Sequence, residues 1–176
     1  MLPNLKLVAA AAGVCAISAV TPATATSLQK LRLDDMVDQS SSVVVGEAMS
    51  SRTERTDAGV FTYTDFRVSD AAFGDMGGTV TVTTLGGRYQ IGKFKFAETW
   101  PGSPHFSAGT RFVLFLQESQ LGQAEVVGYS QGAINVVESS DGDSVRTPEG
   151  AMEKLPSFMN RVRAMKAKGR AKKDMD

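Results

Sequence analysis

Short β-branched or apolar runs that end in glycine follow one another along Val43–Val137, and they limit the folds open to this chain. Thr79–Leu85 alternates polar and apolar residues, as expected of a strand with one buried face. Arg111–Leu116 is an apolar run of strand length, which predicts a central strand buried on both faces. The chain is therefore predicted to be mainly β. Further strands are expected at residues 43–45, 60–68, 124–129 and 133–137.

Helical spacing is confined to the two ends of this β-rich region. Residues 27–38 read as a short amphipathic helix, and Met152–Met165 as a second helix that Pro156 breaks or restarts. No strand–helix–strand alternation lies between them, so an antiparallel sheet is expected. The pattern predicts a small antiparallel barrel with a short N-terminal helix and a C-terminal helix.

The connections between the predicted strands are polar or rich in glycine and proline. Ser50–Ala58 is expected to be a hairpin loop, and Gly86-Gly87 is expected to end a strand. Residues 88–109 are expected to be irregular, although Ile91, Phe94 and Phe96 are compatible with a short strand.

Residues 1–25 have the order of a secretory signal peptide. Lys6 is their only charged residue, Leu7–Val20 is apolar, and Ala23-Thr24-Ala25 has small residues where a signal peptidase requires them. We expect cleavage before Thr26 and a secreted or periplasmic protein.

Two other interpretations of this segment fit less well. An apolar stretch of 14 residues is short for a membrane anchor, which needs about 20. Lipidation at Cys15 is not expected, since Ala12 and Val14 do not match the residues that precede a lipidated cysteine. Removal of residues 1–25 would take away the only cysteine.

The remaining 151 of the 176 residues are enough for one domain with its own core. We expect a single barrel-like domain over residues 26–160 and a basic, partly disordered tail over 161–176. Of the 19 basic and 19 acidic residues only Lys6 lies in the signal segment, so the domain is nearly neutral and nucleic acid is not an expected partner. With one histidine and no cysteine, neither a zinc site nor a cofactor is predicted.

The order of several core segments resembles that of known proteins. The segments are the Ser-Ser-Val-Val-Val-Gly-Glu pattern at Ser41–Glu47, the strand Tyr63–Val68, the Thr-Val-Thr-Val strand before Gly86-Gly87, and Phe106–Leu116. This order is similar to that of secreted bacterial proteins of unassigned function and, more distantly, to the OB-like barrel of netrin-like and tissue metalloprotease inhibitor domains. The resemblance implies an OB-like barrel. Those inhibitors chelate zinc through an N-terminal cysteine, and this chain has no cysteine after Cys15, so that mechanism is not carried over.

One loop stands out as a candidate protein-binding surface. Trp100 to Phe106 contains two prolines and a glycine, which stiffen the backbone and lower the entropy lost on binding. Trp100, His105 and Phe106 are the candidate contact residues. The competing interpretation is that Trp100 and Phe106 fold back and plug one end of the barrel. His105 is the only histidine, and no Gly-x-Ser-x-Gly motif accompanies it, so no catalytic set is predicted.

The C-terminal segment is rich in cations. These residues are candidate contacts for an anionic surface, or else a solvated helix end: Arg161, Arg163, Lys166, Lys168 and Arg170.

Three functional hypotheses follow. The first is an exported, non-enzymatic binding module that contacts a protein partner, possibly an exported protease. The second is an envelope-associated protein that uses its basic C-terminal helix on anionic surfaces. The third is an enzyme of an unrecognised class, which would require a deep pocket lined by His105 and two carboxylates.

Overall fold

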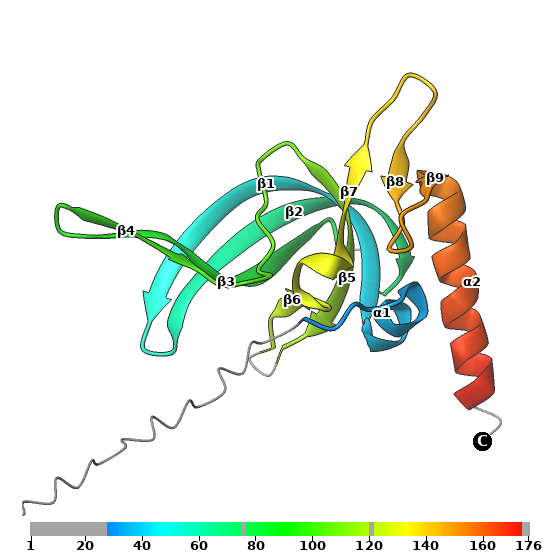
Figure 1. The fold of residues 1–176 in the computed structure, drawn as a ribbon, viewed down its shortest axis with the longest axis horizontal. Helices are drawn as coiled ribbons and strands as arrows, with labels where there is room; N and C mark the ends of the chain where they lie inside the picture. The colour runs from blue at the N-terminus through cyan, green and yellow to red at the C-terminus, as the bar shows by residue number, and fades with distance from the viewer. Residues whose placement is uncertain (1–27, 75–76, 120–121, 174–176) are drawn as a thin grey trace, which may run out of the picture.

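The computed structural model describes residues 28–74, 77–119 and 122–173, so the predicted signal peptide at residues 1–25 lies outside the described part. Within these ranges the chain forms two α-helices, nine strands and one 3-10 turn. Figure 1 shows the helices side by side at one end of the molecule and two long hairpins that project away from them. Neither of the two helices in these ranges is long and apolar enough to cross a membrane.

A ring of five strands forms the centre of the fold. These strands are β1 (Ser42–Thr56), β2 (Gly59–Phe73), β3 (Thr79–Ile91), β5 (Arg111–Glu118) and β6 (Ala124–Val126). They are ordered β1-β2-β3-β6-β5, and β5 pairs back onto β1 from Ser42↔Leu116 to Glu47↔Arg111, which closes the ring. The expectation of a mainly β fold with a small OB-like barrel is therefore confirmed. One detail differs, because the short β3–β6 pair is parallel and the others in the ring are antiparallel.

Four shorter strands lie outside the ring, so the barrel is not a simple one. They are β4 (Phe94–Thr99), β7 (Ala133–Val137), β8 (Ser144–Arg146) and β9 (Met152–Lys154). β4 pairs with the end of β3, while β7, β8 and β9 extend the sheet from β5. The 3-10 turn η1 (Tyr129–Gly132) connects β6 to β7.

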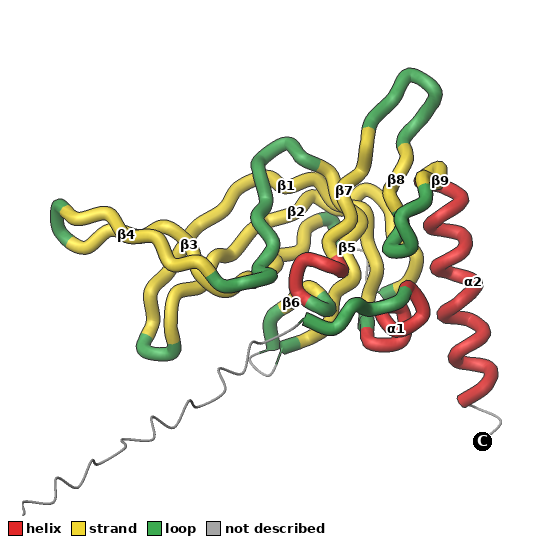
Figure 2. Tube along the Cα trace, in the orientation of Figure 1, coloured by secondary structure: helices red, strands yellow, loops and turns green. Residues whose placement is uncertain are grey.

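Two helices pack against the outside of the barrel and against each other, as Figure 2 shows in red. α1 (Leu33–Gln39) precedes β1, and α2 (Leu155–Lys173) follows β9 directly. Pro156 is the second residue of α2, in the first turn where the missing N–H is not needed, so the helix begins just before this proline and is not broken by it.

Strand β5 separates two hydrophobic cores. Val113 and Phe115 belong to the cluster that includes the helices, with the Phe115 and Phe158 rings edge to face at 6.4 Å. Leu114 and Leu116 belong to the cluster inside the ring. The predicted central strand with two buried faces is confirmed.

The structure corrects several predicted boundaries. β1 does not end at Gly46-Glu47: it continues through the expected loop to Thr56, and only Asp57 and Ala58 form the turn to β2. β3 does not end at Gly86-Gly87 either, because these glycines, at φ of +84° and +146°, let the strand leave β2 and pair with β4. Part of the region expected to be irregular is therefore a regular hairpin.

The helix boundaries differ as well. α1 begins at Leu33, since residues 28–32 are not helical: the backbone of Arg32 is extended, and the N–H of Leu31 donates to the side-chain oxygen of Gln131 at 2.8 Å. α2 continues to Lys173 and so passes through the domain boundary expected at residue 160. The tail expected to be partly disordered over 161–176 is helical as far as Lys173, and residues 174–176 lie outside the described ranges.

Candidate functional site

Hydroxyl side chains line one face of the hairpin formed by the outer halves of β1 and β2. The strand register pairs Ser51 with Thr64 and Thr53 with Thr62, and Thr62 in turn with Thr84 of β3. The hydroxyls bond to one another across the strands, at 2.8 Å between Ser51 and Thr64 and 3.0 Å between Thr53 and Thr62. This surface offers donors and acceptors without a charge.

Strand β3 bends over this hydroxyl face at its two glycines. Thr62 donates its hydroxyl to the carbonyl of Gly86 at 2.7 Å, which fixes the crossing. A Cβ added to Gly87 would lie 2.6 Å from Cγ2 of Thr53 and would also collide with Oγ1 of Thr62. Only glycine lets the backbone approach the hydroxyls this closely.

The loop predicted as a binding surface forms the opposite wall. Ser103 donates its hydroxyl to the Leu85 carbonyl at 2.8 Å, which ties the loop to β3. Trp100 is 48% exposed, and its Nε1–H donates to Oε1 of Glu98 at 2.8 Å, so the indole is held in place while its ring remains accessible. His105 is exposed.

Phe106 has a different role from the other two candidate residues. Its ring is buried and packs edge to face against Phe66 at 4.9 Å and Phe112 at 5.1 Å. The structure thus separates the two aromatics of the loop: Phe106 closes the barrel core, and Trp100 lies at the surface. Phe106 is not available to a partner.

Together these walls enclose a groove of about 530 Å³, named here the hydroxyl groove. It is lined by Ser51, Thr53, Thr62, Thr64, Thr84–Arg88, Ala97, Thr99, Trp100 and Ser103–Phe106. None of these described lining residues is Asp, Glu, Lys or Cys, so His105 has no carboxylate beside it on the groove lining. The groove can accept hydrogen bonds, donate them and stack a planar group on Trp100. In the part of the chain that the structure describes, no cluster of three metal-ligating side chains is present.

Two ionisable groups of the β-sheet have shifted pKa values, and neither lines the groove. The pKa of Asp65 is lowered mainly because its carboxylate accepts a hydrogen bond from Thr81 at 2.6 Å; burial opposes this, and Ser50 and Arg52 add smaller lowering effects. The pKa of Arg111 is raised mainly by its hydrogen bond to Asp143 at 2.6 Å, with Glu138 adding to the effect. Both shifts come from ion-pairing and hydrogen bonds that support the fold.

Three of the five candidate cations of the C-terminal segment are bound to the rest of the protein. Arg161 pairs with Glu153 at 2.7 Å, and Arg163 pairs with Asp70 at 2.9 Å. Lys166 donates to two backbone carbonyls at the end of α1. Only Lys168 and Arg170 of this group are exposed without such a contact.

The hydroxyl face of β1 and β2 is the part of the site that sequence reasoning missed. Threonines alternate with other residues along 60–68 and 79–85, and this alternation can be seen in the sequence. It predicts a strand, but it does not predict which face of the strand lines a groove. No family model matches the chain, and no curated protein matches it.

Proposed function

We propose that this chain is an exported, non-enzymatic binding module that holds a protein partner in the hydroxyl groove. The observation that carries the proposal is Trp100, a half-exposed indole fixed by Glu98 at the rim of a polar groove. Tryptophans in such positions are frequent hot spots of protein interfaces. Export rests on the signal-like order of residues 1–25.

An extended segment of the partner suits this groove. β1 pairs with β5 only as far as Glu47, so one edge of the strand from Ser50 to Thr56 has no neighbouring strand among the described residues. The backbone groups of such an edge can pair with a strand of the partner, and the hydroxyl face beside this edge can bind polar side chains of that strand. The resemblance to netrin-like and metalloprotease inhibitor domains makes an exported protease one partner worth testing.

The two other hypotheses gain less support from the geometry. Envelope attachment through the C-terminal helix would have to rely on Lys168 and Arg170, since Arg161, Arg163 and Lys166 are bound within the protein. An enzyme that uses His105 would have to recruit carboxylates from outside the groove lining.

The proposal is tested by capture of exported proteins on the immobilised chain, followed by affinity measurement with the purified captured partner. We expect Trp100→Ala to weaken binding at least about tenfold, because truncation of a hot-spot tryptophan costs about 2 kcal/mol or more. Hydrogen exchange on the complex is expected to show new protection in β1 and in the 100–106 loop.

Met152→Ala is the matched control, since Met152 is also a half-exposed apolar residue but lies on β9, away from the groove. It is expected to bind like the unaltered protein. If Trp100→Ala and His105→Ala both leave the affinity unchanged, and protection appears elsewhere, the groove is not the binding site.

A further inference from the structure

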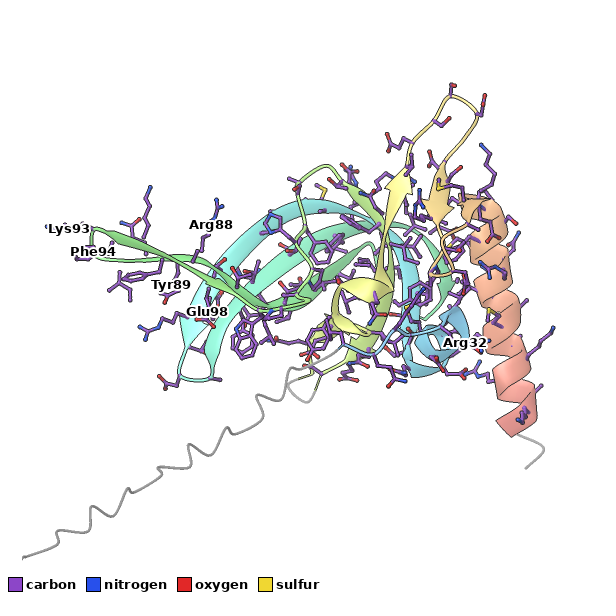
Figure 3. The ribbon with its side chains drawn as sticks, in the orientation of Figure 1. Arg32, Arg88, Tyr89, Lys93, Phe94 and Glu98 are labelled. Atoms are coloured by element: carbon purple, nitrogen blue, oxygen red, sulfur yellow. The ribbon has the colours of Figure 1, made fainter. Side chains whose placement is uncertain are left out.

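The hairpin of β3 and β4 carries an apolar face that nothing in the described structure covers. The register Tyr89↔Phe96 and Ile91↔Phe94 places these four side chains on the same face of a two-stranded ribbon. Phe94 is 62% exposed, Ile91 47% and Phe96 43%, and the Tyr89 and Phe96 rings stack at 5.4 Å. Figure 3 shows Lys93 and Phe94 at the projecting tip, with Tyr89 nearer the barrel. Contiguous apolar surface of this kind marks an interaction site.

The charges of the outer part of the hairpin, residues 88–97, are all of one sign. Residues 88–97 contain Arg88, Lys93 and Lys95 and no acid, in a chain whose formal net charge is zero. The ammonium of Lys93 lies 5.7 Å from the centre of the Phe94 ring. Glu98, the first acid after them, is bonded to Trp100. Arg88 and Lys95 lie on the face of the ribbon opposite the apolar side chains, so the occupant must surround the tip of the hairpin and combine negative charge with apolar material.

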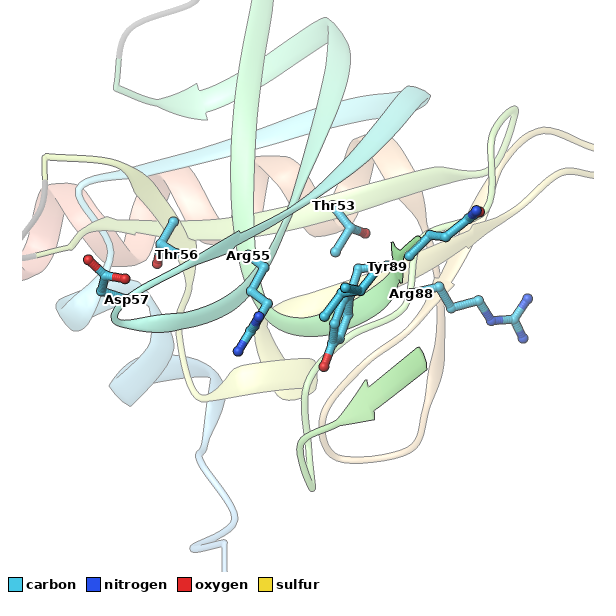
Figure 4. Close-up of a pocket in the computed structure, with 8 residues that line it drawn as sticks. Thr53, Arg55, Thr56, Asp57, Arg88 and Tyr89 are labelled. Atoms are coloured by element: carbon cyan, nitrogen blue, oxygen red, sulfur yellow. The ribbon is translucent and has the colours of Figure 1, made fainter. Parts of the chain in front are cut away.

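A fourth cation comes from the neighbouring hairpin. A cleft of about 790 Å³ separates the β1–β2 turn from β3, and Arg55 and Arg88 both line it. The guanidinium of Arg55 lies 6.0 Å from the Tyr89 ring centre. Figure 4 shows Arg55 beside Tyr89, while Asp57, an acid that also lines the cleft, lies on the far side of Arg55.

We propose that the β3–β4 hairpin docks on the surface of a bilayer that contains anionic phospholipids. Ile91 and Phe94 enter the interface between headgroups and acyl chains, and Arg55, Arg88, Lys93 and Lys95 contact the phosphates. The alternation of lysine and phenylalanine favours a bilayer over a protein. Lysine is depleted in protein interfaces, whereas at a bilayer its long stem lies along apolar material and its ammonium reaches the headgroups. Each such cation strengthens binding to an anionic leaflet.

Vesicle flotation tests the proposal. The experiment uses the chain from Thr26 on, because the apolar stretch Leu7–Val20 would bind vesicles by itself and every element of the described fold follows residue 26. The chain is expected to float with vesicles that contain phosphatidylglycerol and at least about tenfold more weakly with phosphatidylcholine alone, and salt is expected to weaken the binding.

Paired substitutions separate the apolar and the charged contributions. Ile91→Ser with Phe94→Ser, and Lys93→Glu with Lys95→Glu, are each expected to reduce flotation at least about tenfold. Their matched controls are Val137→Ser with Met152→Ser, and Lys168→Glu with Arg170→Glu, which change exposed residues elsewhere and are expected to leave binding unchanged. Circular dichroism checks that all four variants fold.

A fluorescent reporter gives a second measurement. Trp100 is the only tryptophan, so Phe94→Trp in a Trp100→Phe background reports on the tip alone. Its emission is expected to shift to shorter wavelength with phosphatidylglycerol vesicles. Absence of flotation and of this shift overturns the proposal. Flotation that is unchanged in the variant with Ile91→Ser and Phe94→Ser also overturns it. A third contrary result is an unaltered chain that does not bind vesicles but forms a dimer or protein complex, which the same variant loses.

Discussion

The shape of the hydroxyl groove depends on the backbone of Gly87. At φ of +146° this residue adopts a conformation that other residues resist, and its missing side chain leaves room for Thr53 and Thr62. Strain and steric overlap would therefore act together if a side chain were added.

Gly87→Ala is expected to lower the free energy of unfolding by about 1–3 kcal/mol, measured by urea denaturation. The added Cβ would collide with the hydroxyl of Thr62 and lie 2.6 Å from a methyl carbon of Thr53. Gly78→Ala is the control, since a Cβ there meets no atom within 4 Å, and it should change stability by less than about 0.5 kcal/mol. Equal stabilities of the two variants would contradict this account of the bend.

At the residue scale, the sequence predicted the loop but not which of its aromatic side chains is buried and which is exposed. The spacing of the prolines and the glycine placed Trp100 and Phe106 in irregular structure. This prediction needs only the local backbone preferences of proline and glycine. Burial of Phe106 depends on Phe66, which is distant in sequence, as well as on Phe112 of the strand that follows the loop. Local patterns carry no information on that contact.

Lys166 joins the two helices at the level of whole elements. Its ammonium donates to the carbonyls of Val37 at 3.1 Å and Ser40 at 2.8 Å, the end of α1, and lies 4.6 Å from the ring centre of Phe73. A cation at this position satisfies carbonyls that the helix leaves free and interacts favourably with the helix dipole.

Lys166→Ala is expected to reduce the free energy of unfolding by about 1–2 kcal/mol, because hydrogen bonds from a charged donor are lost and the carbonyls are left without it. Lys168→Ala removes an exposed lysine of the same helix and should have an effect below about 0.5 kcal/mol. Chemical denaturation of both variants measures the difference. A Lys166 variant as stable as the Lys168 variant would show that this contact contributes nothing.

Strands could be located from the sequence only where at least one of their faces is buried. Thr79–Leu85 and Arg111–Leu116 lie against the core, and their apolar patterns located them correctly. Beyond the barrel, Ser50–Thr56 has both faces near solvent, so no alternation remains and the segment resembles a loop. The β3–β4 hairpin was expected only in part, as a short strand compatible with Ile91, Phe94 and Phe96, because its apolar face is not buried in the protein.

At the scale of the whole molecule, the closure of the ring was beyond sequence analysis. Glycine-rich turns and β-branched runs predicted a small barrel, but not that β5 pairs with β1 or that β6 runs parallel to β3. These pairings join segments far apart in the chain. They are selected by how the side chains of the whole core pack together, and a short stretch of sequence carries no information on that packing.

The helices and the two proposed binding surfaces lie at opposite ends of the molecule (Figure 1). The helices pack at one end, and the hydroxyl groove and the β3–β4 hairpin lie at the other, as Figure 1 shows for the elements concerned. Substitutions in the helices are therefore expected to change the free energy of unfolding, and substitutions of exposed side chains on the hairpins to change binding.

Truncation of α2 tests this separation and the domain boundary that the sequence placed at residue 160. A chain ending at Asn160 loses Val162, which is fully buried, and the bonds of Arg163 to Asp70 at 2.9 Å and to the Ala71 carbonyl at 2.8 Å. Burial of a valine contributes about 1.5–3 kcal/mol, so the shortened chain should lose about 3 kcal/mol or more of its stability toward urea. A chain ending at Gly169 retains all these contacts and should differ from the full chain by less than about 1 kcal/mol. If the chain ending at Asn160 were as stable as the one ending at Gly169, residues 161–169 would be a dispensable tail and not part of the folded core.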